Sequence, residues 1–168
     1  MKINVINQAK VPSLQIEFLK TWCQKIQREL KKQGFGKSLQ NKNLTVVFLE
    51  SAAAKKINLQ FRKRNYATDV LSFDSFDSSS LGELVLCWPV LKKQAVKHGH
   101  STKFELGYMV LHGILHLLGF EHEKTEAEAI EMFRLQDQIF EVISIQYVNR
   151  SRSPSGQKKN SRSRTARS

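Results

Sequence analysis

The chain has 168 residues, of which 40% are hydrophobic, and a formal net charge of +12 at pH 7. This length predicts one domain with an ordinary core. No apolar run approaches the roughly 20 residues that span a bilayer, and the N-terminus lacks the apolar region of a secretory signal. We therefore expect a cytoplasmic protein with no membrane partner, whose only cysteines, Cys23 and Cys87, are buried free thiols.

The basic charge is unevenly distributed. Seven of the 27 Lys and Arg residues fall in 149–168, a segment with no acidic residue, no aromatic residue and no aliphatic residue larger than Ala166. Such a segment cannot bury enough surface to offset the entropy of ordering, so we expect a domain at 1–148 and a basic disordered tail at 149–168. A basic tail attracts polyanions such as RNA through counterion release. The alternative is a solubilising terminus with no specific role.

The first elements of the chain are a strand and a long helix. Residues 2–6 alternate apolar and polar side chains and are predicted as a short strand. Pro12 and Ser13 then open a helix to about Lys32, which ends at the glycines Gly34 and Gly36. Its predicted core stripe consists of Leu14, Phe18, Leu19, Trp22, Cys23, Ile26 and Leu30.

The middle of the chain mixes strands with short helices. Three strand-like runs lie at 44–49, 69–73 and 82–88. Ser51 is expected to cap a helix over 51–61, and Pro89 suits the first turn of another helix that ends near Gly99. His98 and His100 follow among lysines and are expected to be solvated.

Two capping boxes predict the last two helices. Thr102 with Glu105 opens the first, and Thr125 with Glu128 opens the second. The second helix is expected to turn four apolar side chains inward: Ile130, Phe133, Phe140 and Ile143. Strands and helices mix without strict βαβ alternation, which indicates an α+β domain.

The stretch HGILHLLGFEH (112–122) holds three of the five histidines. His112 and His116 are four residues apart and share one face of a helix. Gly119 permits the left-handed conformation that ends a helix, and the resulting turn brings His122 back toward them. Three imidazoles with an open fourth position are the catalytic arrangement for Zn²⁺. We therefore predict that these residues bind one zinc ion; the alternative is three core or surface histidines without a metal.

The same histidine spacing occurs in metzincin proteases. Those enzymes carry a glutamate general base beside the first histidine, where this chain has Gly113. Loss of such a base removes on the order of 10²–10⁴-fold in rate. The pattern therefore indicates a hydrolytic metal but argues against a peptidase. Glu121 either orients a ligand or moves a proton, or is a surface residue.

A basic triplet, Arg62, Lys63 and Arg64, precedes the third predicted strand. Arginine binds phosphate in a bidentate manner and stays charged. If Arg62 faces the metal, it can hold a scissile phosphate. The local sequence alone favours a solvated basic turn.

Three motifs, HGILHLLGFEH, TDVLSF and LGELVLC, resemble in this order those of the YbeY family of metal-dependent endoribonucleases. The family pattern is H-G-x-L-H-L-x-G-[YF]-D-H, preceded by N-x-x-[YF]-R, T-[DN]-V-L-S-F-P and G-D-[IL]-x-[IL]-C, and the match covers most of residues 3–145. The resemblance implies an α+β domain in which a small mixed β-sheet packs with helices and the metal lies at one end of a cleft.

The resemblance also implies roles for individual residues. His112, His116 and His122 match the zinc ligands, and Arg62, in NLQFR, matches a functionally important arginine. We take Arg62 and His116 as catalytic, and the triplet that begins at Arg62 as RNA-binding. The implied activity is cleavage of single-stranded RNA in the 3′-end maturation of small-subunit (16S) rRNA and in ribosome quality control. The implied partners are rRNA, the small ribosomal subunit and its assembly factors.

Several positions depart from the family pattern. Glu83 and Glu121 stand where the family has Asp, and both are candidates for orienting the metal ligands. Asp74 and Ala67 replace common prolines, and Asn65 replaces a common Asp. Two other functions stay open: a metallohydrolase for a peptide or another small substrate, and a zinc-stabilised RNA-binding or ribosome-assembly module with little catalysis.

Overall fold

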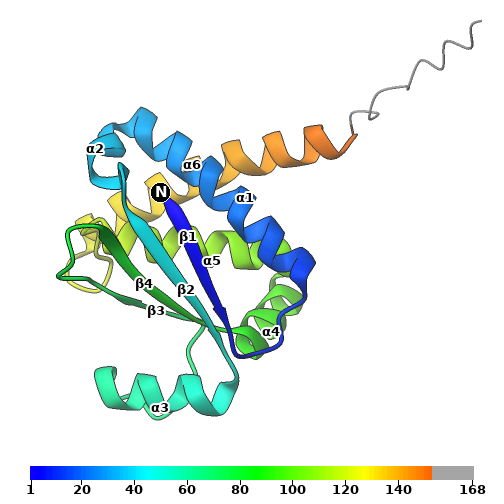
Figure 1. The fold of residues 1–168 in the computed structure, drawn as a ribbon, viewed down its shortest axis with the longest axis vertical. Helices are drawn as coiled ribbons and strands as arrows, with labels where there is room; N and C mark the ends of the chain where they lie inside the picture. The colour runs from blue at the N-terminus through cyan, green and yellow to red at the C-terminus, as the bar shows by residue number, and fades with distance from the viewer. Residues whose placement is uncertain (153–168) are drawn as a thin grey trace, which may run out of the picture.

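A four-stranded mixed sheet forms the centre of the computed structural model, which describes residues 1–152 (Figure 1). The strand order is β1-β2-β4-β3; β1, β2 and β4 are parallel, and β3 is antiparallel to β4. The strands are β1 (Lys2–Asn7), β2 (Asn43–Leu49), β3 (Val70–Phe73) and β4 (Ser80–Cys87). The predicted strands and the single α+β domain with a small mixed sheet are confirmed.

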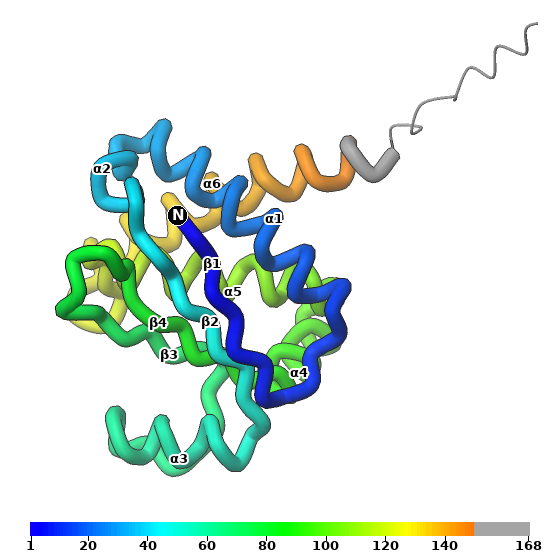
Figure 2. The backbone as a smooth tube through the Cα atoms, in the orientation of Figure 1, coloured from blue at the N-terminus to red at the C-terminus, as the bar shows by residue number. Residues whose placement is uncertain are grey.

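Helices cover both faces of this sheet. They are α1 (Ser13–Leu30), α2 (Gly36–Leu39), α3 (Ser51–Arg62), α4 (Trp88–His98), α5 (Thr102–Leu117) and α6 (Glu126–Arg152), with a π-type turn (Lys31–Phe35) between α1 and α2. In the tube view, α3 lies apart from α1, α5 and α6 (Figure 2). None of these helices has an apolar stretch that could cross a membrane. Residues 153–168, where most of the predicted basic tail falls, lie outside the described residues.

Strand alternation divides the core into two layers. Phe48 and Leu84 belong to the main core with α1, α5 and α6, whereas Val85 and Cys87 pack with α3 on the other face. Both cysteines are buried free thiols, as expected, and burial raises the pKa of Cys23 to about 12. The sheet therefore separates α3 from α5, the helix that carries His112 and His116.

The backbone of α5 packs closely against its two neighbours, strand β4 and helix α1. A Cβ atom on Gly113 would lie 2.6 Å from Leu84 Cδ2 of β4, and one on Gly107 would lie 2.6 Å from Trp22 Cε2 of α1. The Trp22 indole also donates a hydrogen bond to the Gly107 carbonyl at 3.1 Å. The two glycines thus fix the distance of α5 from the sheet and from α1.

Replacing Gly113 with alanine is expected to lower the free energy of unfolding by about 1–3 kcal/mol, because the new methyl group overpacks against Leu84. Urea denaturation measures the change. Gly36→Ala is the control, since its Cβ would meet only the flexible side chain of Lys31 at 3.1 Å. Equal stability of Gly113→Ala and the wild type would contradict the close packing.

Some packing predictions were wrong. Leu14 and Ile130 are each 61% exposed, and Phe133 is 39% exposed. Ile143 is buried and Phe140 packs against the core, as predicted, but the other buried side chains of α6 are Met132, Gln136 and Ile139. The N-terminal half of α6 runs beside an open cleft, so its apolar side chains that do not point at the core face solvent.

Two of the three helix caps differ from those predicted from the sequence. Ser101, not Thr102, caps α5 by accepting a hydrogen bond from the Phe104 N–H at 3.3 Å. Ser51 is the first residue of α3 and makes no side-chain cap. The predicted cap of α6 is confirmed: the Glu128 N–H donates to Thr125 Oγ1 at 3.2 Å.

Glu105 has a different role from the predicted cap. It is 3% exposed, and its Oε2 lies 3.1 Å from His98 Nδ1 and 3.7 Å from His100 Nδ1. These two histidines are half-exposed and paired with a buried carboxylate, rather than simply solvated.

Candidate metal centre

The end of α5 and the turn behind it bring three histidines together. Gly119 adopts a φ of +92°, and the Gly119 and Phe120 N–H groups donate to the His116 and Leu115 carbonyls at 2.9 and 3.0 Å. The chain then reverses, and one ligand nitrogen from each of His112, His116 and His122 lies within 4.8 Å of the others. The predicted clustering of these residues is confirmed.

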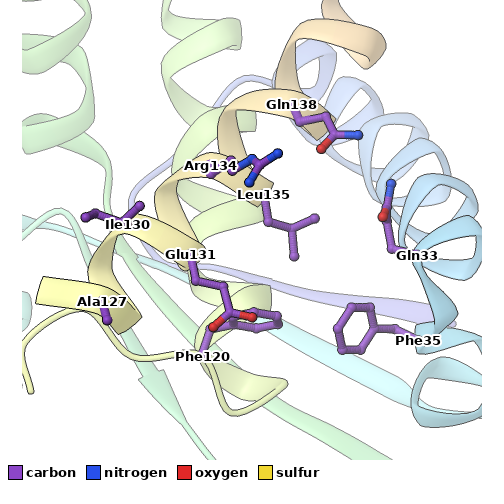
Figure 3. Close-up of a pocket in the computed structure, with 9 residues that line it drawn as sticks. All are labelled: Gln33, Phe35, Phe120, Ala127, Ile130, Glu131, Arg134, Leu135 and Gln138. Atoms are coloured by element: carbon purple, nitrogen blue, oxygen red, sulfur yellow. The ribbon is translucent and has the colours of Figure 1, made fainter. Parts of the chain in front are cut away.

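A second layer of packing supports the turn from behind. Figure 3 shows Phe120 beside Phe35 of the π-type turn in a pocket of about 480 Å³, with Leu135 of α6 above them. The two ring centroids are 5.6 Å apart in an edge-to-face arrangement. None of the three histidines lines this pocket. The contact between Phe35 and Phe120 therefore supports the turn from outside the histidine cluster.

Hydrogen bonds define the tautomers of two imidazoles. His112 Nδ1 lies 2.9 Å from Gln136 Oε1, and His116 Nδ1 lies 3.0 Å from the Phe120 carbonyl oxygen. Both oxygens only accept, so both Nδ1 atoms carry the proton. Ligating histidines commonly donate through the second nitrogen in this way.

The Nε2 atoms of His112 and His116 therefore face one another as two acceptors, 3.1 Å apart. No proton lies between them to relieve the repulsion of the lone pairs. A cation would relieve it, and tetrahedral zinc with Zn–N distances of about 2.0–2.1 Å separates its ligand nitrogens by about 3.3 Å. The residues thus fit a metal ion with three imidazole ligands.

Burial favours the neutral form of these ligands. Desolvation lowers the pKa of His112, and the nearby His116 and His122 add to the effect, while the Gln136 hydrogen bond opposes it. Desolvation and His122 likewise lower the pKa of His116. Neutral imidazoles are the form that binds metals. The fold therefore keeps these two side chains able to bind a metal at pH values somewhat below the usual histidine pKa.

We expect the metal-free protein to lose stability as the pH falls below about 6.5. In that range the unfolded chain takes up protons on these histidines that the folded chain excludes, so the free energy of unfolding decreases with falling pH. Urea denaturation with a chelator at pH 7.5 and 5.5 measures the difference in the free energy of unfolding between the two pH values. His116→Gln, which cannot titrate, should show a smaller difference; an equal difference would contradict the explanation.

Two residues of α6 lie at the centre although the sequence pattern did not assign them to it. Gln136 is fully buried and orients His112, and its Nε2 atom has no partner among the described residues. The Phe133 ring lies 6.2 Å from the His112 ring and 5.2 Å from the His122 ring. Its exposure, unexpected for a core position, follows from this place at the cleft.

The histidines line a cleft of about 300 Å³ that also contains Arg62, Arg64 and Glu123. Glu123 Oε1 lies 3.8 Å from a guanidinium nitrogen of each arginine, and all three side chains are about half exposed. The three histidines and two of the three predicted basic residues therefore meet at one site.

The loop after α3 determines which of the basic residues reach the cleft. Lys63 adopts the left-handed conformation at the helix end, and its ammonium group donates to the Gln60 carbonyl at 3.1 Å, outside the cleft. Asn58, fully buried, anchors the loop by donating to the Tyr66 carbonyl at 2.8 Å. No sequence motif indicated this role of Asn58.

The two predicted orienting carboxylates occupy different places. Glu121 Oε1 lies 3.9 Å from His116 Nδ1, next to the centre. Glu83 is exposed on β4, between Gly82 and Leu84, which both contact α5. Strand alternation turns Glu83 to the opposite face of the sheet, so the structure does not bring it to the histidines.

Gly113 explains the missing general base in steric terms. Its position faces Leu84 and lies 3.2 Å from Ser72 Oγ, measured from an added Cβ. A side chain there would have to push aside the Leu84 side chain of β4 and would crowd Ser72 of β3. The cleft instead contains the carboxylates of Asp69 and Glu123.

Comparison with known proteins identifies the family. The family model described as Endoribonuclease YbeY matches residues 4–144. The chain belongs to the YbeY endoribonuclease family. The Endoribonuclease YbeY of Bdellovibrio bacteriovorus is 53% identical over 144 residues, which are 85% of this chain and 95% of that protein. The YbeY of Persephonella marina is 36% identical over 137 residues, or 78% and 85% of the two chains.

A solved structure agrees with the YbeY assignment. The solution structure of TM1509 from Thermotoga maritima has a TM-score of 0.62 and 26% sequence identity, and the match covers 95% of this chain and 99% of that one. The YbeY family membership expected from the histidine, TDVLSF and LGELVLC motifs is confirmed.

Proposed function

We propose that this chain is a metal-dependent endoribonuclease that cleaves single-stranded RNA. The observation that carries the proposal is the cleft in which His112, His116 and His122 face the guanidinium groups of Arg62 and Arg64. Family membership supports RNA as the substrate. We further propose Zn²⁺ as the metal, cytoplasmic small-subunit (16S) rRNA 3′-end maturation and ribosome quality control as the role, and the small subunit with its assembly factors as partners.

The three histidines would hold the metal, which supplies a Lewis acid and a bound water of lowered pKa when present. Arg62 and Arg64 would bind the scissile phosphate and stabilise the negative charge that develops on it. Gln136 and the Phe120 carbonyl keep the Nε2 atoms of His112 and His116 directed into the cleft.

Asp69 is a positioning residue in this mechanism rather than a free base. Its Oδ1 accepts from the Val70 N–H at 2.8 Å and the Thr68 hydroxyl at 3.0 Å, and its Oδ2 accepts from Gln94 Nε2 at 2.9 Å. These bonds fix the start of β3 along the cleft wall.

Cleavage of a single-stranded rRNA fragment by the purified full chain tests the proposal. We expect cutting that stops when a chelator removes the metal and returns when Zn²⁺ is added back. Retention of RNA without any cutting would contradict the proposal and favour a zinc-stabilised RNA-binding module.

Glu123 occupies the position at which a substrate phosphate would pair with the arginines. RNA must replace this carboxylate, and exposed ion pairs of this kind contribute at most about 1 kcal/mol. Glu123→Gln is therefore expected to lower the KM for RNA by roughly two- to fivefold, with kcat little changed. Glu126→Gln, an exposed carboxylate outside the cleft, controls for the change in net charge. Equal KM changes in both variants would contradict a specific role of Glu123.

A further inference from the structure

A second cavity, of about 460 Å³, adjoins the metal-centred cleft between α4, α5 and α6. The two share Asp69, Tyr108 and Met109 in their walls. The larger pocket in Figure 3 shares no lining residue with the cleft. The second cavity, rather than the pocket behind the turn, is therefore the one that adjoins the histidines.

The charges of this cavity differ from those of the cleft. Its walls contain the carboxylates of Asp69, Glu105 and Asp137, and its lining residues, all in the described part of the chain, include no Lys or Arg. His98 and His100 also line it, and both pair with Glu105, which leaves Asp137 as a carboxylate with no cationic partner among these residues. A phosphate group would be repelled there and attracted to Arg62 and Arg64 in the cleft. The cavity thus suits the uncharged part of a nucleotide, the base.

Apolar groups in the cavity offer faces for such a base. The rings of Tyr108 and Phe140 meet edge to face with centroids 5.1 Å apart, and Met109 lies beside them, 9% exposed. Unstacked RNA bases bind to proteins by contact with aromatic side chains and by hydrogen bonds along the base edge.

Two polar side chains of the cavity have acceptor oxygens with unused capacity. Asp137 Oδ1 accepts from the Tyr108 hydroxyl at 3.1 Å, which uses one of about four acceptor sites on the carboxylate. The Gln94 amide donates to Asp69, and its buried Oε1 has no partner among the described residues. A ligand that fits these walls supplies adjacent N–H donors.

We propose that this cavity is a guanine subsite, in which the Asp137 carboxylate accepts the ring N–H and the amino group on one edge of the base. Among the four RNA bases, guanine alone presents these two donors side by side. The inference rests on the proposed function only in taking RNA as the substrate. It predicts that the enzyme prefers single-stranded sites with a guanine at a fixed position near the cut.

Binding of mononucleotides tests the subsite without cleavage. The ¹³C-methyl resonance of Met109 in the zinc-loaded full chain would be followed during titration with guanosine 5′-monophosphate, uridine 5′-monophosphate and ribose 5-phosphate. We expect a saturable shift with the guanosine nucleotide, and binding on the order of tenfold weaker both for the uridine nucleotide and for ribose 5-phosphate, which reaches the arginines of the cleft but has no base. Equal shifts with ribose 5-phosphate would show a phosphate site and overturn the proposal.

Asp137→Asn is the informative variant, because asparagine keeps an oxygen for the Tyr108 hydroxyl but loses the charged acceptor pair. It should weaken guanosine nucleotide binding about tenfold. Glu141→Gln, which changes an exposed carboxylate of α6 outside the cavity, should leave the affinity for the guanosine nucleotide unchanged. Unchanged affinity in Asp137→Asn would overturn the assignment.

Sequencing the ends of cleaved random single-stranded RNA gives a second readout. Wild-type enzyme should enrich guanine at one position relative to the cut, and Asp137→Asn should reduce that enrichment toward the frequency in the library. No enrichment by the wild type would overturn the subsite. Selective guanosine binding in a protein that cuts no RNA would refute the proposed function and leave the subsite standing.

Discussion

Replacing His116 with alanine is expected to abolish metal-dependent RNA cleavage and to weaken zinc binding by at least about 100-fold. The three rings form a nearly regular triangle: the His116 centroid lies 4.7 Å from His112 and 5.0 Å from His122, and the latter two are 5.0 Å apart. Loss of His116 leaves two imidazoles, too few to compete with water for the ion. Zinc content after dialysis and cleavage of the single-stranded fragment measure the two effects.

The control for this variant is Gln138→Ala, an exposed residue of α6 outside the cleft. It should retain zinc and cleavage, which excludes a difference in purification. Because His116 also hydrogen-bonds the Phe120 carbonyl, thermal unfolding of the variant should be recorded. Cleavage at the wild-type rate by a folded His116→Ala protein that lacks zinc would refute the metal-dependent mechanism.

Replacing Arg62 with alanine is expected to reduce kcat/KM by about 10²–10³-fold while zinc binding stays intact. This is the usual cost of removing one donor that stabilises charge in a transition state. The side chain lines the cleft with the three histidines, is 41% exposed, and pairs only loosely with Glu123 at 3.8 Å. It is therefore available to a substrate phosphate.

Two companion variants sharpen the test. Arg62→Lys should recover only part of the activity, because an ammonium group cannot form the bidentate contact of a guanidinium. Lys63→Ala should reduce kcat/KM only about twofold, through weaker general attraction of RNA, since its side chain lies outside the cleft. Similar losses in Arg62→Ala and Lys63→Ala would contradict a specific phosphate contact.

The histidine cluster could be predicted because it depends on local geometry. The four-residue interval of His112 and His116 follows the helical period, and Gly119 alone permits the reversal that returns His122. Arg62 could not be placed in this way. Some 50 residues separate it from the ligands, and only the resemblance to a known family indicated that the loop after α3 reaches them.

Other contributors to the site depend on tertiary packing. Gln136 resembles any polar residue of a helix, and only the position of α6 against α5 makes it the partner of His112. Glu83 lies in a recognised motif, but the period of two along β4 turns it away from the centre. Glu105 fits the spacing of a capping box, yet the buried pairing with His98 replaced that role.

The close approach of Gly113 to Leu84 also limits how this enzyme can change its chemistry. A glutamate at position 113 would supply the base that peptidases of the same histidine spacing use, but its Cβ would lie 2.6 Å from Leu84 Cδ2, so the Leu84 side chain would have to move. A second substitution would have to shorten fully buried Leu84, and emptying such a site costs about 2–5 kcal/mol. Conversion to a peptidase thus requires two coupled changes that each destabilise the fold, so the packing of one helix on one strand limits the reactions that this cleft can acquire.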